Sequence, residues 1–349
     1  MVNHMRMFSG CYTALITPMK KGGEIHFDGL RSLIDFQISE GVQGILAVGT
    51  TGESPTLDWN EHIQVIEGVQ DRIAEKCTVI AGTGSNSTKE AIDATQQAYN
   101  SGLRCFLLVD PYYNGPSSME IRKEYIEPIA RLFPEAQFIP YIIPGRTGTQ
   151  LLPQDLAVLH SQFQNVRAVK EATGNLENMR LTRKLCGDDF DILSGDDDKT
   201  YDMMTSADIT ASGVISVVSN IAPGAVHSMI RYLLDENMER ASRLCEALRP
   251  LFSMVTVKTD EQTPFGSVPC KARNPLPCKT LMNVLGMPSG PIRQPLGKMT
   301  KASLETVLNQ ARQVYEKSPE ILGPVEKFFN VDLSQRLYTK RFWEGLYYD

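Results

Sequence analysis

Short apolar segments alternate with amphipathic segments along the first part of the chain. Eight of the apolar segments have the length of single strands, and their continuous hydrophobicity is typical of parallel strands covered on both faces. They lie at Cys11–Thr17, Gly44–Gly49, Thr78–Gly82, Arg104–Asp110, Gln137–Ile143, Val166–Ala172, Asp191–Asp196 and Gly213–Val218.

The segments between these strands carry apolar residues at helical spacing. The clearest is Asp58–Ile73, where an aspartate and a glutamate three residues later predict a capping box. Lys89–Ser101 and Ser117–Phe133 are further examples. Strand and helix alternate eight times, which favours a closed (β/α)8 TIM barrel of the α/β class over an open sheet. We expect this catalytic barrel to occupy residues 8–223.

After residue 223 the pattern changes. Helical periodicity continues without an intervening strand, which predicts a helical C-terminal region over residues 224–317. Its expected helices are Ala225–Glu236, Glu239–Val257, Asn274–Leu285 and Lys301–Lys317. Residues 318–349 form an extension rich in aromatic side chains, which we expect to pack on the protein or to form an interface. The length of 349 residues suits one barrel of about 250 residues with an appendage.

Charge and composition argue against several classes of function. The formal net charge is −6, and the chain has no basic run that could follow a phosphate backbone, so no nucleic-acid role is expected. There is no stretch of about 20 apolar residues and no apolar N-terminal signal segment, so we expect no membrane segment and a cytoplasmic location. The start of the natural chain stays open among Met1, Met5 and Met7.

Neither the cysteines nor the histidines indicate a metal site. The seven cysteines include no C-x-x-C pair, and their use fits a reducing compartment. The five histidines share no strand-end position, so a metal-dependent aldolase is not expected.

Lys170 is the most unusual residue of the predicted barrel. Alternation along its strand places it on the same side as Val166 and Ala168. An ammonium group that faces a core costs several kcal/mol unless it has a partner or a task. The side chain could reach water from a strand end. Alternatively, desolvation could lower its pKa and make it an amine nucleophile for a carbonyl substrate.

Polar and glycine-rich runs follow the other predicted strands, at the end where active sites of this barrel class lie. Tyr141 shares a strand face with Ile139, and Thr50 is in phase with Leu46 and Val48, so both should reach the barrel mouth. The runs are Gly49–Ser54, Asp110–Asn114, Tyr141–Gly148, Ser194–Asp197 and Gly213–Ser216. Together they predict an imine-forming enzyme, in which the lysine attacks a keto group, hydroxyls relay protons, and hydroxyl and N–H groups hold a carboxylate.

At this point the chain resembles a known family. The run Gly49-Thr50-Thr51-Gly52-Glu53, a tyrosine five residues before an arginine, and Lys170 are similar to the motifs of the pyruvate-dependent class I aldolase family that contains dihydrodipicolinate synthase and N-acetylneuraminate lyase. The resemblance covers residues 8–317. It implies that Lys170 forms an imine with pyruvate, with no metal or organic cofactor. It also implies that Tyr141 is the general acid and base, and that Thr50 relays protons between Tyr141 and Tyr113 of a neighbouring subunit.

The same resemblance assigns the substrate-binding groups. It implies that Thr51 holds the pyruvate carboxylate and that backbone groups of Gly195 and Ile215 line the pocket. In members that condense pyruvate with aspartate semialdehyde, an arginine at the place of Arg146 binds the carboxylate of the second substrate. A bidentate contact between arginine and carboxylate is a physical reason for that preference.

The implied activity is therefore that of a lyase of the class I aldolase type, which acts in diaminopimelate and lysine biosynthesis. The alternative is a pyruvate lyase for a sugar acid such as N-acetylneuraminate or a 2-keto-3-deoxy sugar acid. Those lyases lack the arginine and tend to carry serine where Thr50 stands. A catalytically silent barrel is a third possibility, and the complete set of catalytic side chains argues against it.

Two features depart from the common pattern of the family. Asparagine usually follows the catalytic tyrosine, whereas here Ile142 follows it. Alternation directs Ile142 toward the helices, so we expect altered packing and retained catalysis. The extension after residue 317 resembles the longer C-terminus of the plant-type subset.

The resemblance also implies regulation and assembly. Members of this type are often inhibited by L-lysine at a dimer interface near the active sites. The matching positions are Ser54, Pro55, Trp59, His62, Asn86, Glu90 and Tyr112. Tryptophan at position 59 is similar to the lysine-sensitive plant-type subset, and its ring could pack on the methylenes of the ligand; it could equally be an interface aromatic. Because Tyr113 acts across subunits, a homodimer is the minimum, and the family implies a tetramer built from two dimers.

Overall fold

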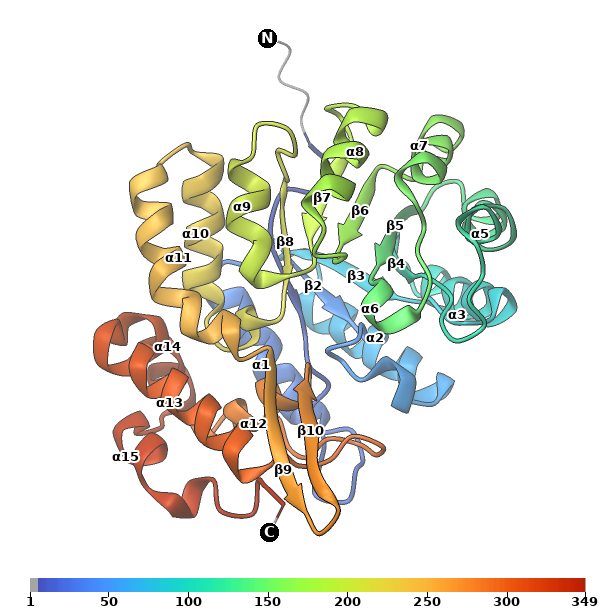
Figure 1. Ribbon diagram of the computed structural model, residues 1–349. Helices are drawn as coiled ribbons and strands as arrows, with labels where there is room; N and C mark the ends of the chain where they lie inside the picture. The colour runs from blue at the N-terminus through green and yellow to red at the C-terminus, as the bar shows by residue number, and fades with distance from the viewer. Residues whose placement is uncertain (1–5, 349) are drawn as a thin grey trace.

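Eight parallel strands close into a barrel in the computed structural model, which describes residues 6–348 (Figure 1). The strands pair in chain order, and β1 pairs with both β2 and β8. They are β1 (Gly10–Ala14), β2 (Gly44–Ala47), β3 (Thr78–Gly82), β4 (Cys105–Val109), β5 (Gln137–Ile142), β6 (Ala168–Glu171), β7 (Asp191–Ser194) and β8 (Gly213–Ser216). Each lies within a run predicted from the sequence, apart from Gly10 at the start of β1, so the predicted fold class is confirmed.

Helices surround the barrel (Figure 1). They are α1 (Phe27–Ser39), α2 (Trp59–Ile73), α3 (Thr88–Asn100), α4 (Ser118–Glu120), α5 (Glu127–Leu132), α6 (Pro144–Thr147), α7 (Pro153–Gln162), α8 (Leu176–Cys186), α9 (Thr200–Thr205) and α10 (Pro223–Leu234). A π-helical stretch, Ile121–Ile126, joins α4 to α5 within the predicted segment Ser117–Phe133. The capping box predicted before α2 is present, with Asp58 and Glu61 bonding each other's backbone N–H groups.

Alternation along the strands separates two hydrophobic clusters. The smaller one fills the barrel and includes Ile139, Tyr141 and Ala168. The larger one lies between the strands and the helices and includes Ile142, so the prediction that Ile142 faces the helices is confirmed. Functional side chains on the inner face of a strand therefore converge on the barrel axis, and those at the strand ends reach its mouth.

Alternation fails at two positions. Val166 precedes β6 and packs in the outer cluster, so the prediction that it shares a face with Lys170 is wrong. Val48 follows the end of β2 with φ of 49° and also packs in the outer cluster, which places it out of phase with Leu46. In both cases the residue lies outside the regular strand, where the period of two no longer applies.

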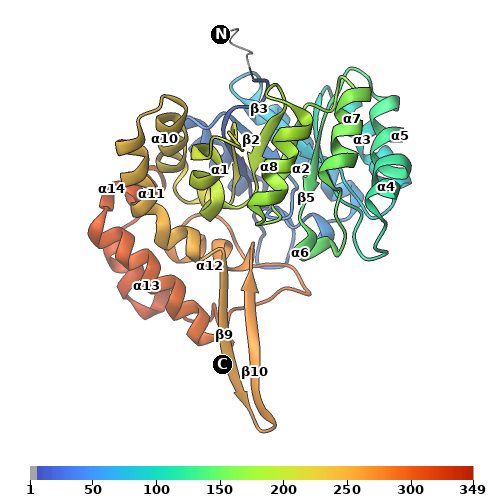
Figure 2. The same cartoon turned by 45° about the horizontal axis from the view of Figure 1, so that its top comes forward.

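The C-terminal region contains α11 (Met238–Ser253), α12 (Leu276–Leu285) and α13 (Lys301–Lys317). The prediction that no strand lies among these helices is wrong. An antiparallel ribbon of β9 (Thr256–Thr263) and β10 (Gly266–Arg273) projects from the mouth side of the barrel (Figure 2). Most of its side chains are exposed on both faces, so the ribbon lacks the apolar alternation that marks a half-buried strand.

The aromatic extension packs on the protein, which was the first of the two alternatives expected from the sequence. It forms α14 (Pro319–Phe329) and α15 (Leu333–Tyr338). The rings of Phe328 and Phe329 each lie with their centroids 5.2 Å from that of Phe36 in α1. One continuous cluster joins barrel, C-terminal region and extension. The divisions at residues 223 and 317 therefore stay predictions as domain boundaries.

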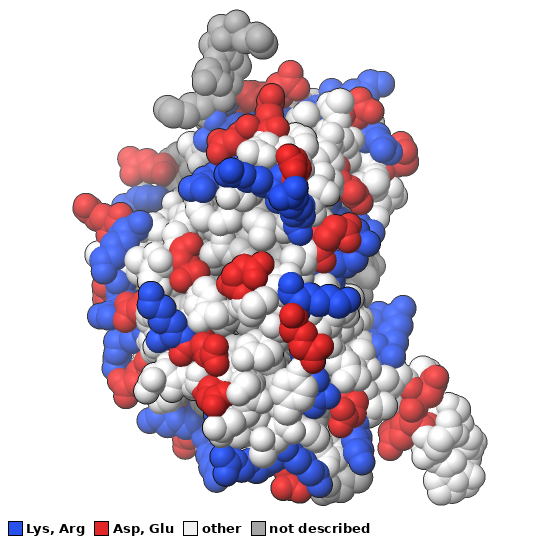
Figure 3. All heavy atoms as spheres, turned by 90° about the vertical axis from the view of Figure 1, so that its left-hand side faces the viewer, with Lys and Arg blue, Asp and Glu red and all other residues white. Residues whose placement is uncertain are grey.

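The surface carries both signs of charge. On the face shown in Figure 3, basic and acidic side chains are interspersed. Within residues 6–348, no helix is long and apolar enough to cross a membrane. All seven cysteines lie in this part of the chain, and all are free thiols. Of the three alternative starts, Met1 and Met5 lie outside the described residues.

Candidate active site

Lys170 and Tyr141 face each other at the barrel mouth. They are register partners on the adjacent strands β6 and β5, so both side chains leave the sheet on the same side. The Lys170 Nζ atom lies 4.4 Å from the centroid of the Tyr141 ring. Apart from this contact, the Lys170 Nζ atom has no hydrogen bond or ion pair to any of the residues 6–348. A buried amine without a direct ionic partner is suited to lose its proton.

Burial sets the protonation state of Lys170. Its side chain is 4% exposed, and desolvation lowers its pKa from 10.5 to about 8, although Asp196 and Asp197 oppose the shift. The neutral amine is therefore far more accessible near neutral pH than in a lysine with the ordinary pKa. The site therefore supplies a nucleophilic amine at neutral pH.

Gly195, at the end of β7, makes room for this lysine. A Cβ atom at Gly195 would lie 3.2 Å from Lys170 Cε and 2.7 Å from the Cβ atom of Ala172. A side chain at this position would therefore crowd both Ala172 and Lys170. Ile215 on β8 is fully buried and belongs to the same barrel cluster. Gly195 thus lies against Lys170, and Ile215 lies in the barrel interior. The ligand contacts of their backbone groups stay a prediction.

Tyr141 is held in its protonated form. Burial raises its pKa to about 12, and the positive charge of Arg146 and a hydrogen bond with Thr50 only partly offset this effect. At neutral pH the phenol can donate a proton, and the Thr50 hydroxyl beside it can extend the relay. The predicted Thr50–Tyr141 pair is therefore brought together.

Two cavities are lined by residues that contact Lys170, although Lys170 itself is in neither lining. The first, of about 300 Å³, is lined by Tyr141, Thr50 and Arg146 among others. The second, of about 1070 Å³, lies between the barrel mouth and the ribbon, and Gly195 and Asp196 are part of its lining. Lys170 lies against one residue of each lining, Tyr141 of the first and Gly195 of the second.

Arg146 and Thr51 share a partner that sequence reasoning missed. The Arg146 Nη2 atom donates to the main-chain oxygen of Asn274 at 2.7 Å, and the Asn274 Nδ2 atom donates to Thr51 Oγ1 at 2.9 Å. Asn274 lies between β10 and α12, more than 200 residues after Thr51 along the chain. No local pattern could have indicated this contact. The only sequence signal is the unusual Asn-Pro-Leu-Pro run that precedes α12.

Asp196 and Asp197 are further acidic groups of the site. Asp197 is buried and accepts hydrogen bonds from Ser216 and from the N–H groups of Val217 and Val218. Asp196 lines the second cavity, and burial raises its pKa to about 6. The sequence predicted polar chemistry for the Ser194–Asp197 run, but it did not distinguish the environments of these two carboxyl groups. Within the described part of the chain, no group of three or more potential metal ligands is arranged to hold an ion.

Tyr113 is not brought into the site within one chain. Its side chain is 91% exposed, and its backbone has a φ of 79°, which is uncommon outside glycine. Its N–H group donates to the main-chain oxygen of Thr147 at 3.4 Å, so the loop lies on the rim beside α6. The predicted relay role of Tyr113 requires a second subunit.

The predicted lysine-binding residues lie along one edge of the barrel mouth. The Ser54 hydroxyl and His62 Nε2 are 2.8 Å apart, and the Trp59 and His62 rings lie 4.9 Å apart. Burial lowers the pKa of His62 to about 4, so its imidazole is neutral. Ser54, Pro55 and Tyr112 line the first cavity.

The remaining two positions of this set lie at the start of α3. Both Asn86 and Glu90 are exposed. The Ser85 hydroxyl donates to the Glu90 carboxylate at 2.6 Å, and its oxygen lies 3.4 Å from the Asn86 amide oxygen. Burial, and to a smaller extent the negative charge of Glu90, raises the pKa of Tyr112, which lines the first cavity. An exposed carboxylate and an exposed amide are groups that could meet an amino-acid ligand.

Comparisons with known proteins agree with this geometry. A 4-hydroxy-tetrahydrodipicolinate synthase of Methanococcus maripaludis is 39% identical over 303 residues, which cover 86% of this chain and 97% of the relative. The structure of dihydrodipicolinate synthase from Aquifex aeolicus matches with a TM-score of 0.80 and 36% identity, over 90% of this chain and 99% of that one.

A third similar protein is the dihydrodipicolinate synthase of Cyanidioschyzon merolae, whose structure has lysine bound. It matches with a TM-score of 0.80 and 34% identity, over 89% of this chain and 99% of that one. The sequence profile of the dihydrodipicolinate synthetase family matches residues 7–314. This chain belongs to the dihydrodipicolinate synthetase family.

Proposed function

We propose that the protein condenses pyruvate with L-aspartate 4-semialdehyde through an imine on Lys170, as the 4-hydroxy-tetrahydrodipicolinate synthase step of diaminopimelate and lysine biosynthesis. The observation that carries the proposal is the buried, unpaired Lys170 amine against Tyr141, with Arg146 at the same mouth. The similar proteins named above support it. No metal or organic cofactor is needed, because the imine itself accepts the electron pair released from the substrate carbon.

The reaction follows from these positions. The neutral Lys170 amine attacks the keto carbon of pyruvate, and Tyr141 protonates the departing oxygen, which leaves as water. The resulting imine loses a methyl proton and becomes an enamine, whose carbon attacks the aldehyde of the second substrate. The amino group of the adduct then attacks the imine carbon, closes the ring and releases Lys170. The net reaction joins the two substrates and expels one water molecule.

The direct test is an initial-rate assay with pyruvate and aspartate semialdehyde, in which a coupled reductase reports the heterocycle. We expect saturable turnover with both substrates. N-acetylneuraminate and 2-keto-3-deoxy sugar acids serve as competing substrates in the cleavage direction. Efficient cleavage of a sugar acid together with no condensation would contradict the proposal and favour the lyase alternative.

Arg146 is proposed to bind the carboxylate of aspartate semialdehyde. Replacing it with alanine should raise the KM for the semialdehyde by about 10- to 100-fold, because a charge-assisted contact is lost. The KM for pyruvate should change by less than about threefold, since pyruvate is held elsewhere. Steady-state kinetics with each substrate varied in turn measure both values.

An Arg146→Lys variant is the matched control for this prediction. It keeps the charge and loses the fork geometry, so its effect should lie between those of wild type and alanine. Equal rises in both KM values, or a semialdehyde KM that does not change, would remove Arg146 from this role.

We infer that the active form is at least a homodimer, built into a tetramer of two dimers. An exposed tyrosine on the rim next to α6 is suited to enter the mouth of a neighbouring subunit. Sedimentation velocity measures the assembly directly, and comparison with a chain ending at residue 317 isolates the part played by the extension.

Mixing two inactive variants tests whether Tyr113 acts across subunits. Neither Tyr113→Phe nor Lys170→Ala should be active alone. In a hybrid dimer, however, one site receives an intact Lys170 from one subunit and an intact Tyr113 from the other. Random exchange of subunits should restore roughly a quarter of the wild-type activity. If the mixture stays as inactive as its components after exchange is verified, Tyr113 does not act in this way.

We further propose feedback inhibition by L-lysine at the edge formed by Ser54, Trp59, His62 and Glu90. The exposed Glu90 carboxylate suits an ammonium group, and the half-exposed Trp59 ring suits the methylenes. Millimolar L-lysine should inhibit turnover. A Glu90→Gln variant should weaken inhibition by about 10-fold or more and leave the uninhibited rate within about twofold. Unchanged activity at millimolar lysine would defeat the proposal.

A further inference from the structure

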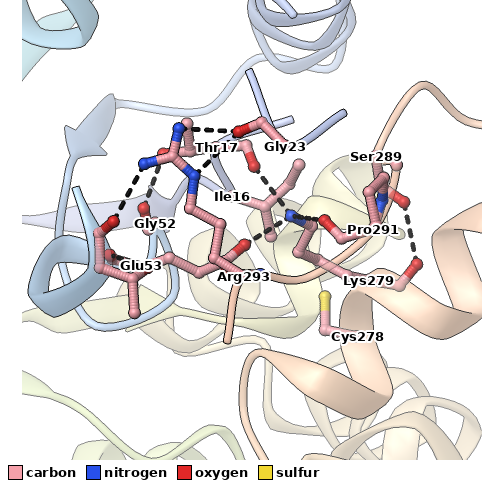
Figure 4. Close-up of polar contacts among 12 residues, drawn as sticks. Ile16, Thr17, Gly23, Gly52, Glu53, Cys278, Lys279, Ser289, Pro291 and Arg293 are labelled. Atoms are coloured by element: carbon pink, nitrogen blue, oxygen red, sulfur yellow. Dashed lines mark hydrogen bonds and ion pairs between the residues drawn. The ribbon is translucent and has the colours of Figure 1, made fainter. Parts of the chain in front are cut away.

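The start of α12 is tied to the loop that carries Thr50 and Thr51. The Lys279 side chain is fully buried and forms an ion pair with Glu53, the last residue of the Gly-Thr-Thr-Gly-Glu run (Figure 4). Its Nζ atom also donates to the main-chain oxygens of Thr17 at 3.0 Å and Pro291 at 2.8 Å. All three ammonium protons thus have acceptors, as a buried charge requires.

The other carboxylate oxygen of Glu53 is also satisfied. It accepts a hydrogen bond from the backbone N–H of Arg293 at 2.8 Å, and the Arg293 guanidinium binds Glu61 and the main-chain oxygen of Gly23. Glu53 itself has a φ of 61°, so the loop turns sharply at this residue. The network fixes the position of the loop relative to α12.

Asn274 lies shortly before α12, and its side chain contacts Thr51 in the candidate site. It is 7% exposed, and its backbone N–H donates to Val255 at 2.9 Å. Its side-chain Nδ2 donates to Thr51 Oγ1, while its main-chain oxygen accepts from Arg146. Next to it, the Arg273 Nη2 atom donates to the main-chain oxygen of Gly145 at 3.1 Å. This is a second hydrogen bond between the segment before α12 and helix α6. One residue therefore contacts two groups that are expected to bind the carboxylates of two different substrates.

The contact with Thr51 decides what the threonine hydroxyl can do. A hydroxyl has one proton to donate and two lone pairs. When Asn274 donates to Thr51 Oγ1, the hydroxyl proton stays free for an acceptor such as a carboxylate oxygen. If Asn274 accepted instead, the same proton would be used up inside the protein.

We infer that Asn274 is a positioning residue, which makes the Thr51 hydroxyl a donor toward pyruvate and orients Arg146 through its main-chain oxygen. This inference rests on the proposed function and extends it to a group outside the barrel strands. The Lys279–Glu53 pair joins α12, which follows Asn274, to the loop that carries Thr51.

Asn274→Asp is the most direct variant, because aspartate has the same shape but only accepts hydrogen bonds at neutral pH. Thr51 must then donate to residue 274 and can no longer donate to pyruvate. We expect the half-saturating pyruvate concentration for borohydride trapping on Lys170 to rise about 10- to 100-fold. The maximal trapping rate should change by less than about threefold, because Lys170 and Tyr141 are untouched.

Asn283→Asp is the matched control. Asn283 lies on α12, bonds the backbone of Gly290 through both amide atoms, and has no contact with Thr51 or Arg146. It should lower the melting temperature as much as Asn274→Asp does, without changing pyruvate affinity. In a Thr51→Val background, Asn274→Asp should have no further effect, since the group that it acts through is gone.

The possible outcomes distinguish a failure of this inference from a failure of the proposed function. A wild-type protein that pyruvate and borohydride do not label would overturn both. Labelled wild type with an unchanged half-saturating concentration for Asn274→Asp would overturn the role of Asn274 alone. Additive effects of Asn274→Asp and Thr51→Val, or an equal shift in Asn283→Asp, would also overturn it, because they would indicate a general loss of structure.

Discussion

A Lys170→Ala variant should lose at least about 10³-fold in turnover and all borohydride-trapped pyruvate. Lys170 is the only amine that lies both inside the barrel mouth and against Tyr141 among the described residues. Without it, no group can form the imine that carries the reaction. The measurements are steady-state turnover with both substrates, and peptide mass spectrometry after reduction with borohydride.

Lys199→Ala is the matched control for this result. Lys199 lines the second cavity but has a substantially exposed side chain, so its loss should leave turnover within about threefold. In the wild type, the trapping rate should rise as the pH passes through about 8, because the neutral amine is the reactive form. Residual trapping on another lysine, at the wild-type rate, would show that the assignment of Lys170 is wrong.

A Tyr141→Phe variant should lose about 10²- to 10³-fold in turnover, because it removes the group placed to move protons at the imine carbon. The ring remains, so the surroundings of Lys170 and its lowered pKa should persist. Pyruvate should therefore still be trapped, more slowly than in the wild type. Single-turnover trapping and steady-state rates together separate these two effects.

Tyr12→Phe provides the comparison for Tyr141→Phe. Tyr12 also lies in the barrel interior, is 3% exposed, and has a pKa raised by burial. Its register partner, however, is Ile215 on β8, whereas that of Tyr141 is Lys170 on β6. Loss of its hydroxyl should leave turnover within about fivefold. Equal losses in the two variants would indicate that barrel packing and not proton transfer explains the effect of Tyr141.

The barrel could be predicted from the sequence because its strands are buried on both faces and are separated by amphipathic helices. That pattern sets the strand positions and also the phase of Tyr141 and Lys170, which face each other across β5 and β6. The two failures of phase, at Val166 and Val48, fall just outside the strands. Periodicity describes regular elements and gives no information where the backbone leaves them.

The ribbon of β9 and β10 escaped prediction for a different reason. Neither of its faces is buried along most of its length, so its residues need not alternate between apolar and polar. Phe265 at its turn is fully exposed. The ribbon nevertheless carries functional consequences, because its base leads into Asn274 and Arg273 beside α6.

The candidate site could be predicted only where strand order brings residues together. Lys170, Tyr141, Thr50, Arg146 and Gly195 lie at the ends of barrel strands, and the barrel places them at one mouth. The contact of Asn274 with Thr51 joins distant parts of the chain through a region whose fold was not predicted correctly. Tyr113 is exposed on the rim of the single chain, so its proposed place in the site of a neighbouring subunit stays a prediction.

The most direct measurement of the central claim is a rapid-quench chase of the enzyme-bound pyruvate. The protein is loaded with isotopically labelled pyruvate, mixed with aspartate semialdehyde and excess unlabelled pyruvate, and quenched with borohydride at increasing times. We predict that label leaves the Lys170 peptide at the rate of turnover and appears in the heterocycle. Label that stays on Lys170 while unlabelled product forms would contradict the account, because condensation would then bypass the imine.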